Sequence, residues 1–334
     1  MRSKMKVLVT GGAGFIGANA IKDLLDDGHE VISFDYTDNP FRLHELKKCP
    51  RFSKNLKIVK GDLRDKIAVA KAVKQADVIL HLGGQVSHLL SQHDPYYDLE
   101  VNVVGTLNIL EAIKEYNPLA YLIYSSSRSV YGKKMKRPDD DPITEEALPE
   151  PIDAYGITKL TCEHYIRLYH YHHGIKTTIL RQANVFGPRQ QLWTPVYQMV
   201  SWVFRRVWLN ETLRFMGDGT QTRDFLYVGD LVNAYLTCME NPDVADGKTY
   251  NVGGLTYCTW NEVIKTAEEV TGNKAKVVYV KHTPIRAKLE NPYSKLDYTK
   301  ISSELGWKPA VSLKEGFERM KKYYESTEFL EDYL

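Results

Sequence analysis

The chain has 334 residues, enough for one large domain or two modest ones with a sizeable core. Its 44 basic and 42 acidic residues give a formal net charge of +2, which argues against a nucleic-acid or membrane-surface partner. The four cysteines form no C-x-x-C pair and no apolar stretch has the length of a membrane span. We therefore expect a protein of the reduced, cytoplasmic compartment with no metal site.

The N-terminal stretch combines a strand-like run with a glycine-rich turn. Residues Lys6–Thr10 are mostly apolar and β-branched, and the glycines Gly11, Gly14 and Gly17 follow at intervals of three, before an amphipathic segment over 18–27. The first glycine permits a sharp turn, the second lets the backbone approach a ligand, and the third lets the helix pack close to the strand. Backbone N–H groups at the start of such a helix bind a pyrophosphate. The pattern predicts a dinucleotide site.

The next predicted strands each end near an acidic residue. The strand over Glu30–Asp35 ends in a carboxylate about 20 residues after the glycine loop, where it would accept the adenosine ribose hydroxyls and repel a 2′-phosphate. Asp35 therefore favours NAD over NADP. Residues 39–54 are polar and contain two prolines, so we expect an irregular segment. A third strand over 56–60 leads to Asp62, which we place near the adenine edge.

Further strands and helices alternate through the first half of the chain. A helix over 67–75 precedes a strand over 78–82, whose His81 we interpret as a packed strand-end residue. Two glycines follow at 83 and 84, and Asp94 caps a long helix predicted over 95–116 before a strand over 121–124. This alternation predicts a parallel sheet covered by helices on both faces, with its ligand at the carboxyl ends of the strands.

A serine-rich strand end and a later helix carry the candidate catalytic residues. The fifth strand runs into Ser127, and a helix opening at Asp153 contains Tyr155 and Lys159 four residues apart, on one helix face. A phenol with an ordinary pKa near 10 is a poor base at neutral pH, but a lysine and a nicotinamide cation would lower that pKa. Lowering it by about three units needs roughly 4 kcal/mol. Ser127 would hydrogen-bond the same substrate oxygen.

These motifs together resemble the extended short-chain dehydrogenases/reductases, and most closely their nucleotide-sugar epimerase and dehydratase group. The resemblance implies a Rossmann-type doubly wound parallel sheet with a smaller C-terminal α/β substrate lobe, and a catalytic set of Ser127, Tyr155 and Lys159. It places the NAD-binding domain at 1–185 with a return segment at about 223–254, and the lobe at 186–222 and 255–334. The NAD contacts expected from it are Gly11, Gly14, Phe15, Ile16, Gly17, Asp35, Asp62, Leu63, Leu82, Gly83, Gln85, Asn102, Tyr155 and Lys159.

The resemblance also implies a nucleotide-diphosphate-sugar substrate. Asn184 lies in a segment similar to the family motif whose asparagine touches the sugar-nucleotide phosphates. Arg223 lies in a segment similar to the diphosphate-binding motif, and a forked guanidinium suits a diphosphate. We assign Arg286 to a second phosphate contact. The remaining substrate contacts expected are Gln85, Ser127 and Arg128.

The residues after Ser127 distinguish the reactions of this family. Its 4,6-dehydratases carry Asp-Glu there, its decarboxylases a glutamate at the place of Ser129, and its 3,5-epimerases a cysteine, whereas this chain has Arg128-Ser129. With no acid or thiol for a second step, we expect a 4-epimerase that oxidises C4 and returns the hydride to the other face. Arg128 either faces outward or contacts a charged substituent of the substrate.

Three alternatives stay open at this point. The first is a 4,6-dehydratase and the second a C4 dehydrogenase/reductase, both of the same family. The third is a non-catalytic nucleotide-binding protein on this fold. By family analogy we expect a homodimer formed by the helices over 95–116 and 153–173. The aromatic stretch over 191–209 is expected to be helical and to line the cleft or join the core.

Overall fold

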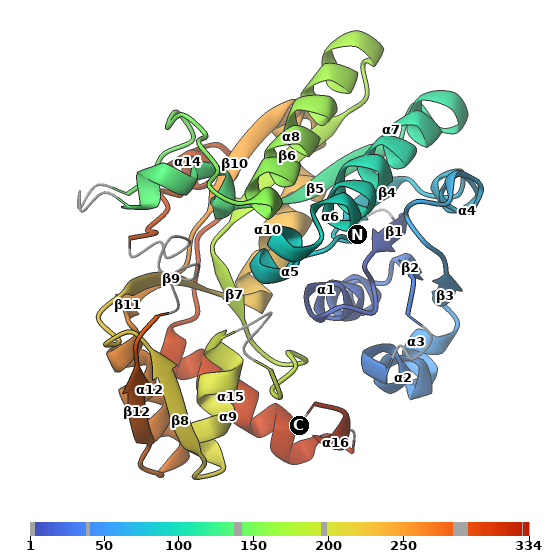
Figure 1. The fold of residues 1–334 in the computed structure, drawn as a ribbon. Coiled ribbons are helices and arrows are strands. Elements are labelled where there is room, and N and C mark those ends of the chain that lie inside the picture. Colours follow the sequence, from blue (N-terminus) through green and yellow to red (C-terminus); the bar gives the residue numbers. More distant parts are fainter. Residues whose placement is uncertain are drawn as a thin grey trace.

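One parallel sheet forms the larger part of the molecule. The computed structural model describes residues 4–37, 41–136, 142–194, 199–282, 293–328 and 330–333. Within them, seven parallel strands are ordered β10-β6-β5-β4-β1-β2-β3 (Figure 1). Their bounds are β1 Lys6–Thr10, β2 Glu30–Asp35, β3 Leu56–Lys60, β4 Val78–His81, β5 Tyr121–Ser127, β6 Thr177–Gln182 and β10 Lys248–Val252. The doubly wound sheet predicted from the sequence is confirmed.

The helices cover both faces of this sheet because successive strand residues point to opposite sides. Val7 and Val9 of β1 belong to the core that α1 and α10 share, whereas Leu8 belongs to the core of α4, α7 and α8. The helices of the described residues are α1 Phe15–Asp26, α2 Phe41–Lys48, α3 Pro50–Ser53, α4 Lys66–Val73, α5 His88–His93, α6 Pro95–Leu99, a π-helical turn at Glu100–Val104, α7 Gly105–Tyr116, a 3-10 segment at Arg128–Lys136, α8 Ala154–His173, α9 Met199–Trp208, α10 Val228–Glu240, α11 Pro242–Ala245, α12 Trp260–Thr271, α14 Thr299–Leu305, α15 Leu313–Ser326 and α16 Leu330–Tyr333.

The order of the strands reverses between β1 and β4, and the loops after these two strands touch. Gly11 has a φ of +66°, and a Cβ built on it would lie 2.7 Å from the Cα of Gly83. The residue after β1 therefore has to be glycine both for its backbone conformation and for the contact. Such a reversal opens a crevice at the carboxyl ends of the strands.

A smaller lobe lies at the carboxyl end of the sheet, below it in Figure 1. It holds a three-stranded sheet of order β11-β9-β7 and a two-stranded sheet of β12 and β8. These strands are β7 Asn184–Phe186, β8 Thr212–Met216, β9 Thr222–Tyr227, β11 Thr256–Thr259 and β12 Lys276–Val280. Between β9 and β11 the chain returns to the large sheet, because β10 pairs with β6.

The C-terminal helix α16 joins several parts of the chain. The Tyr333 ring is buried and lies edge-on to Phe41 of α2, with ring centres 5.1 Å apart. Its carbonyl accepts a hydrogen bond of 2.8 Å from Leu192 N, in the loop after β7. The guanidinium of Arg42 lies 5.7 Å from the same ring. This junction packs against both α2 and the chain that enters the smaller lobe.

Three predicted segments differ from the structure. Residues 41–48 and 50–53 are helical where an irregular segment was expected, because Leu43, Leu46 and Phe52 are buried against the core. The single helix predicted over 95–116 is interrupted by a π-helical turn, although Asp94 caps its start by accepting a bond from Tyr97 N. Within 191–209 the described helix covers only Met199–Trp208.

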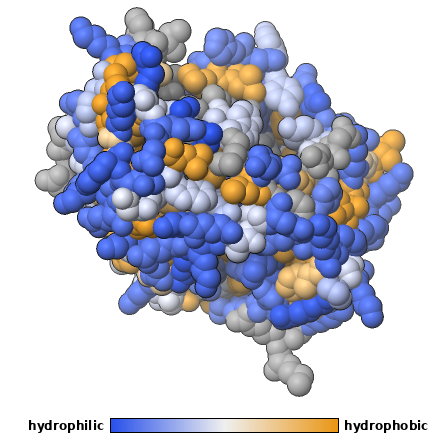
Figure 2. Space-filling view, turned by 90° about the horizontal axis from the view of Figure 1, so that it is seen from below, coloured by the Kyte–Doolittle hydropathy of each residue, from blue (hydrophilic) through white to orange (hydrophobic). Residues whose placement is uncertain are grey.

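The surface of the molecule is mainly hydrophilic on the face seen in Figure 2, with hydrophobic residues in separate small groups. None of the helices in the described ranges combines the length and the hydropathy needed to cross a bilayer.

Candidate active site

A cavity of about 720 Å³ opens where the sheet strands end and continues to the smaller lobe. It brings together loops that follow β1, β2, β3, β4, β5 and β6, and residues of β8, β9 and α12. Of the residues predicted for the site, those that line this one cavity are Gly11, Gly14, Phe15, Ile16, Gly17, Asp35, Asp62, Leu63, Leu82, Gly83, Gln85, Ser127, Arg128, Tyr155, Asn184 and Arg223. Arg286 lies outside the described residues.

The glycine loop has the shape that a dinucleotide needs. A Cβ on Gly17 would lie 2.2 Å from the Gly11 carbonyl oxygen, and a Cβ on Gly14 would lie 3.0 Å from the same atom. Helix α1 begins directly after Gly14, and its first internal hydrogen bond, of 3.0 Å, is donated by Ala18 N to Gly14 O. The preceding amides of the first turn, including that of Phe15, therefore have no intrahelical acceptor and suit a pyrophosphate.

Two carboxylates line the cavity where β2 and β3 end. Asp35 accepts bonds of 3.1 Å from the backbone N–H groups of both Ala13 and Thr37, which fix its orientation at the end of β2. Burial raises the pKa of Asp35, and these two bonds act against that rise. Asp62 instead pairs with Arg64 at 2.7 Å, and hydrogen bonds from Arg64 lower the Asp62 pKa. Asp35 is thus held by backbone N–H groups and Asp62 by a guanidinium, and the contact of Asp35 with a ribose stays a prediction.

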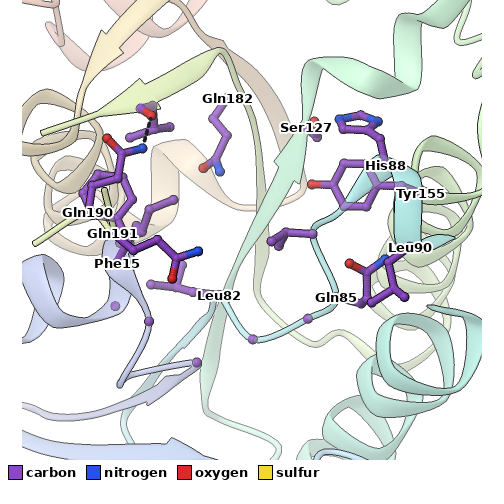
Figure 3. A pocket seen from close by; sticks show the side chains of 18 of the residues that line it. Phe15, Leu82, Gln85, His88, Leu90, Ser127, Tyr155, Gln182, Gln190 and Gln191 are labelled. Atoms are coloured by element: carbon purple, nitrogen blue, oxygen red, sulfur yellow. Dashed lines mark hydrogen bonds between the residues drawn. The ribbon is translucent and has the colours of Figure 1, made fainter. Parts of the chain in front are cut away.

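The predicted serine and tyrosine meet at the other end of the cavity. Ser127 is the last residue of β5, and its Oγ donates to Ser129 Oγ and accepts from Ser129 N, both at 3.1 Å. Tyr155 lies in the first turn of α8, which Asp153 caps by accepting from Gly156 N. Figure 3 shows the Tyr155 hydroxyl directed toward Ser127, with both side chains at the cavity. The two hydroxyls therefore lie at the same part of the cavity.

Lys159 lies behind the cavity wall. Its ammonium group donates a bond of 2.9 Å to the Ser125 carbonyl and lies 5.9 Å from the centre of the Tyr155 ring. Burial lowers the pKa of this lysine. The side chain is 4% exposed, and Lys159 is not among the residues that line the cavity.

Asn102 is likewise buried and does not line the cavity. It lies in the π-helical turn, and its side chain accepts from Gln85 N at 2.9 Å and donates to Gln85 O at 3.1 Å. The side-chain Nε2 of Gln85 in turn donates to Asp98 Oδ1 at 2.7 Å. Asn102 therefore fixes the loop after β4, and its contact with the cofactor stays a prediction.

Tyr155 differs from the sequence-based expectation in its pKa. Burial raises the pKa of its phenol above the ordinary value near 10, while the Ser127 hydroxyl and the Arg128 charge act in the opposite direction. The expected lowering by Lys159 stays a prediction, and its ammonium group is directed at the Ser125 carbonyl. Burial acts against the low phenol pKa that a base at neutral pH needs.

His81 is buried at the carboxyl end of β4, the central strand of the sheet. Its Nδ1 lies 2.8 Å from Thr10 Oγ1 and its Nε2 lies 3.0 Å from Thr106 Oγ1, so both ring nitrogens are hydrogen-bonded. Burial lowers its pKa to about 3, with the Lys159 charge as a further cause. The interpretation of His81 as a packed strand-end residue is confirmed.

The sequence analysis missed a histidine–carboxylate pair beside Tyr155. His88 Nδ1 lies 2.6 Å from Asp153 Oδ2, and the His88 ring is edge-on to the Tyr155 ring with centres 4.8 Å apart (Figure 3). Burial acts to raise the Asp153 pKa, but hydrogen bonding and charge from His88, with the Gly156 N–H, outweigh it. These residues are 65 positions apart, so only the fold brings them together.

The substrate side of the cavity contains two arginines. Arg128 donates from Nε to Asn184 Oδ1 at 2.8 Å and from Nη1 to Met135 Sδ at 3.1 Å, so its side chain is turned toward β7 and lines the cavity. An outward-facing Arg128 is therefore wrong. Arg223 of β9 is 9% exposed and also lines the cavity. Within the described ranges, no three His, Cys, Asp or Glu side chains gather closely enough to hold a metal ion.

Comparison with known proteins agrees with this geometry. The model of the family described as GDP-mannose 4,6 dehydratase matches residues 8–320. The chain belongs to this family. The family is part of the extended short-chain dehydrogenases/reductases, and its relatives here are nucleotide-sugar epimerases and related enzymes. A putative UDP-glucose 4-epimerase of Methanocaldococcus jannaschii is 33% identical over 96% of this chain and 98% of its own.

Solved structures of the family have the same fold. UDP-glucose 4-epimerase from Thermotoga maritima, crystallised with UDP-glucose, has a TM-score of 0.85 and 32% identity, covering 96% of this chain and 99% of its own. UDP-glucuronic acid 4-epimerase from Bacillus cereus, in complex with UDP-glucuronic acid and NAD, has a TM-score of 0.83 and 28% identity over 96% and 98% of the two chains. The family uses NAD, which is the cofactor of this protein.

Proposed function

We propose that the protein is a nucleotide-sugar 4-epimerase with a tightly bound NAD. The observation that carries the proposal is the meeting of Ser127 and Tyr155 at one end of the cavity whose other end is the glycine loop. Neither an acid nor a thiol follows Ser127, where the family's dehydratases, decarboxylases and 3,5-epimerases carry one. The relatives named UDP-glucose 4-epimerase support the same reaction.

The proposed mechanism divides the work between the cofactor and the side chains. When bound, the nicotinamide of NAD supplies the acceptor for a hydride from the sugar and later returns it, and its positive charge favours the Tyr155 phenolate. Tyr155 removes the proton of the sugar hydroxyl and later gives it back. Ser127 holds the sugar oxygen in place, and the charge of Lys159 lies close behind Tyr155.

We assign the sugar-nucleotide diphosphate to the wall of the cavity that β7 and β9 form. Arg223 lines the cavity from β9, and its guanidinium suits two phosphates. Asn184 and Arg128 lie at the same wall, joined by their hydrogen bond. Arg286 is proposed as a further phosphate contact. In this assignment the NAD-binding domain comprises 1–185 with the return segment at about 223–254, the lobe comprises the rest, and two copies form a homodimer.

The test is incubation of the purified protein with UDP-, GDP-, dTDP- and CDP-sugars, with no added NAD and with products identified by NMR. We expect the C4 epimer of at least one sugar, together with NAD or NADH released when the purified protein is denatured. A 4-keto-6-deoxy product would instead identify a dehydratase. Accumulation of reduced nicotinamide during turnover, measured by absorbance, would identify a net dehydrogenase.

A further inference from the structure

The His88–Asp153 pair is built into two helices of the site. His88 is the first residue of α5, which Ser87 caps by accepting from Leu90 N. Asp153 caps α8 through one carboxylate oxygen, which accepts from Gly156 N at 2.7 Å, and contacts His88 Nδ1 through the other. The Asp153 side chain is 4% exposed, and these two hydrogen bonds offset the cost of removing its carboxylate from water. The pair is therefore held from both sides.

This arrangement fixes which nitrogen of His88 is the base. An ionised carboxylate only accepts hydrogen bonds, so Nδ1 carries a proton and, in the neutral imidazole, Nε2 has the lone pair. Nε2 has no hydrogen-bond partner within the described part of the chain, and the His88 side chain is 42% exposed and lines the cavity. An imidazole nitrogen with a lone pair directed at a cavity suits a general base.

The pair also lies where the sugar reacts. The His88 ring is edge-on to Tyr155, at an interplanar angle of 70°, and both side chains face the cavity beside Ser127 (Figure 3). Arg128, a positive charge at the same wall, lies close enough to act on both Tyr155 and Asp153. A base beside a ketone, with a cation near it, is the arrangement that removes a proton from a neighbouring carbon.

The geometry points to His88 as a second acid–base group, which exchanges a proton with a carbon adjacent to the keto carbon of the bound sugar. Nε2 takes the proton, the C–H electron pair forms a C=C bond, and the carbonyl π pair moves to oxygen as an enolate. Return of the proton restores the ketone, so nothing is oxidised or reduced. The inference rests on the proposed function, which supplies the ketone in the site.

The test supplies that ketone directly. The purified holoprotein is incubated in D₂O with UDP-, dTDP-, GDP- and CDP-4-keto-6-deoxyglucose in turn, and loss of the H3 and H5 signals is followed by proton NMR. We expect exchange at one of these carbons, with at least one nucleotide, about a hundredfold or more above the rate without protein. His88→Gln should lower the exchange rate by about 10² to 10⁴.

Two further variants separate the base from its support. Asp153→Asn keeps a good helix cap but no longer fixes the His88 tautomer, so exchange should also fall. His93→Gln, at the exposed end of the same helix α5, should exchange as the unaltered protein does. Each variant is first checked by thermal unfolding.

Exchange in His88→Gln at the rate of the unaltered protein, or no exchange with any of the four ketones, would overturn this role. Neither result affects the C4 epimerisation test, which starts from sugars with a hydroxyl at C4 and is scored at that carbon alone. Conversely, absence of a C4 epimer would remove the proposed function even if the ketones exchange.

Discussion

The two ends of the cavity are built in different ways. The proposed cofactor end is formed mainly by backbone: three glycines, the first turn of α1, and the close contact of Gly11 with Gly83. At the sugar end, the wall consists of side chains from distant parts of the sequence, such as Ser127, Tyr155 and His88. A backbone site tolerates no added atom, whereas a side-chain site depends on which functional groups it carries. The two ends should therefore fail differently when altered.

The largest effect is expected at the sugar end. Tyr155→Phe removes the hydroxyl that exchanges the substrate proton, so kcat for the proposed reaction should fall by about 10² to 10⁴. Because the glycine loop and the other expected cofactor contacts are unaltered, the variant should still release NAD(H) on denaturation. Unchanged activity would revive a non-catalytic binding protein.

The cofactor end is broken by an added methyl group. In Gly17→Ala the Cβ would lie 2.2 Å from the Gly11 oxygen, which requires the loop to move, whereas in Gly28→Ala, beyond the end of α1, nothing lies within 4 Å of it. We expect Gly17→Ala to retain at least about tenfold less bound NAD than Gly28→Ala, measured per mole of purified protein. Equal retention in the two variants would contradict a close-fitting loop.

At the cofactor end, Asp35 is expected to act through its functional group, as the side chains at the sugar end do. Asp35→Asn keeps the size of the residue but removes the charge that favours ribose hydroxyls over a 2′-phosphate. Since a hydrogen bond to a charged group contributes about 1.5–3 kcal/mol, the preference for NAD over NADP should fall about ten- to a hundredfold. Titration of the cofactor-free protein with each dinucleotide measures this ratio, and Asp62→Asn, at a carboxylate already paired with Arg64, is the matched control.

The smallest effect concerns His81, which lies between the two ends and links β1, β4 and α7. Its folded-state pKa of about 3 lies below the ordinary value of about 6.5, so its contribution to stability is complete above pH 6.5 and is lost as the pH falls. Between pH 6.5 and 5.5 this loss should be about 1 kcal/mol. In urea unfolding, the free energy of unfolding of His81→Asn should fall by about 1 kcal/mol less between pH 6.5 and 5.5 than that of the unaltered protein. His93→Asn should show the same fall as the unaltered protein.

The same contrast explains what the sequence could predict. The cofactor end follows from local patterns, because one strand, one turn and one helix start contain most of it, and Glu30–Asp35 and Leu56–Lys60 were placed correctly as strands. The sugar end requires distances across the chain. His88 and Asp153 carry no motif, and the orientation of Lys159 toward the Ser125 carbonyl depends on how α8 packs on β5.

Local rules also failed where burial decided the structure. Residues 41–48 are rich in charged side chains and follow a proline, yet they form α2 because Leu43 and Leu46 complete the core. The π-helical turn at Glu100–Val104 has no breaker residue in its sequence. The turn contains Asn102, whose side chain bonds to both the N–H and the carbonyl of Gln85. We attribute the local change from α-helix to this long-range contact.

The junction at Tyr333 has a practical consequence for labelling. The ring is buried against α2 and its carbonyl is bonded to Leu192, so this contact lies beside the chain that enters the smaller lobe. Trp193, next to Leu192 and 54% exposed, is a natural fluorophore at the same place. Its emission, measured in a variant whose other four tryptophans are replaced by phenylalanine, offers a label-free signal of whether ligands draw the lobes together.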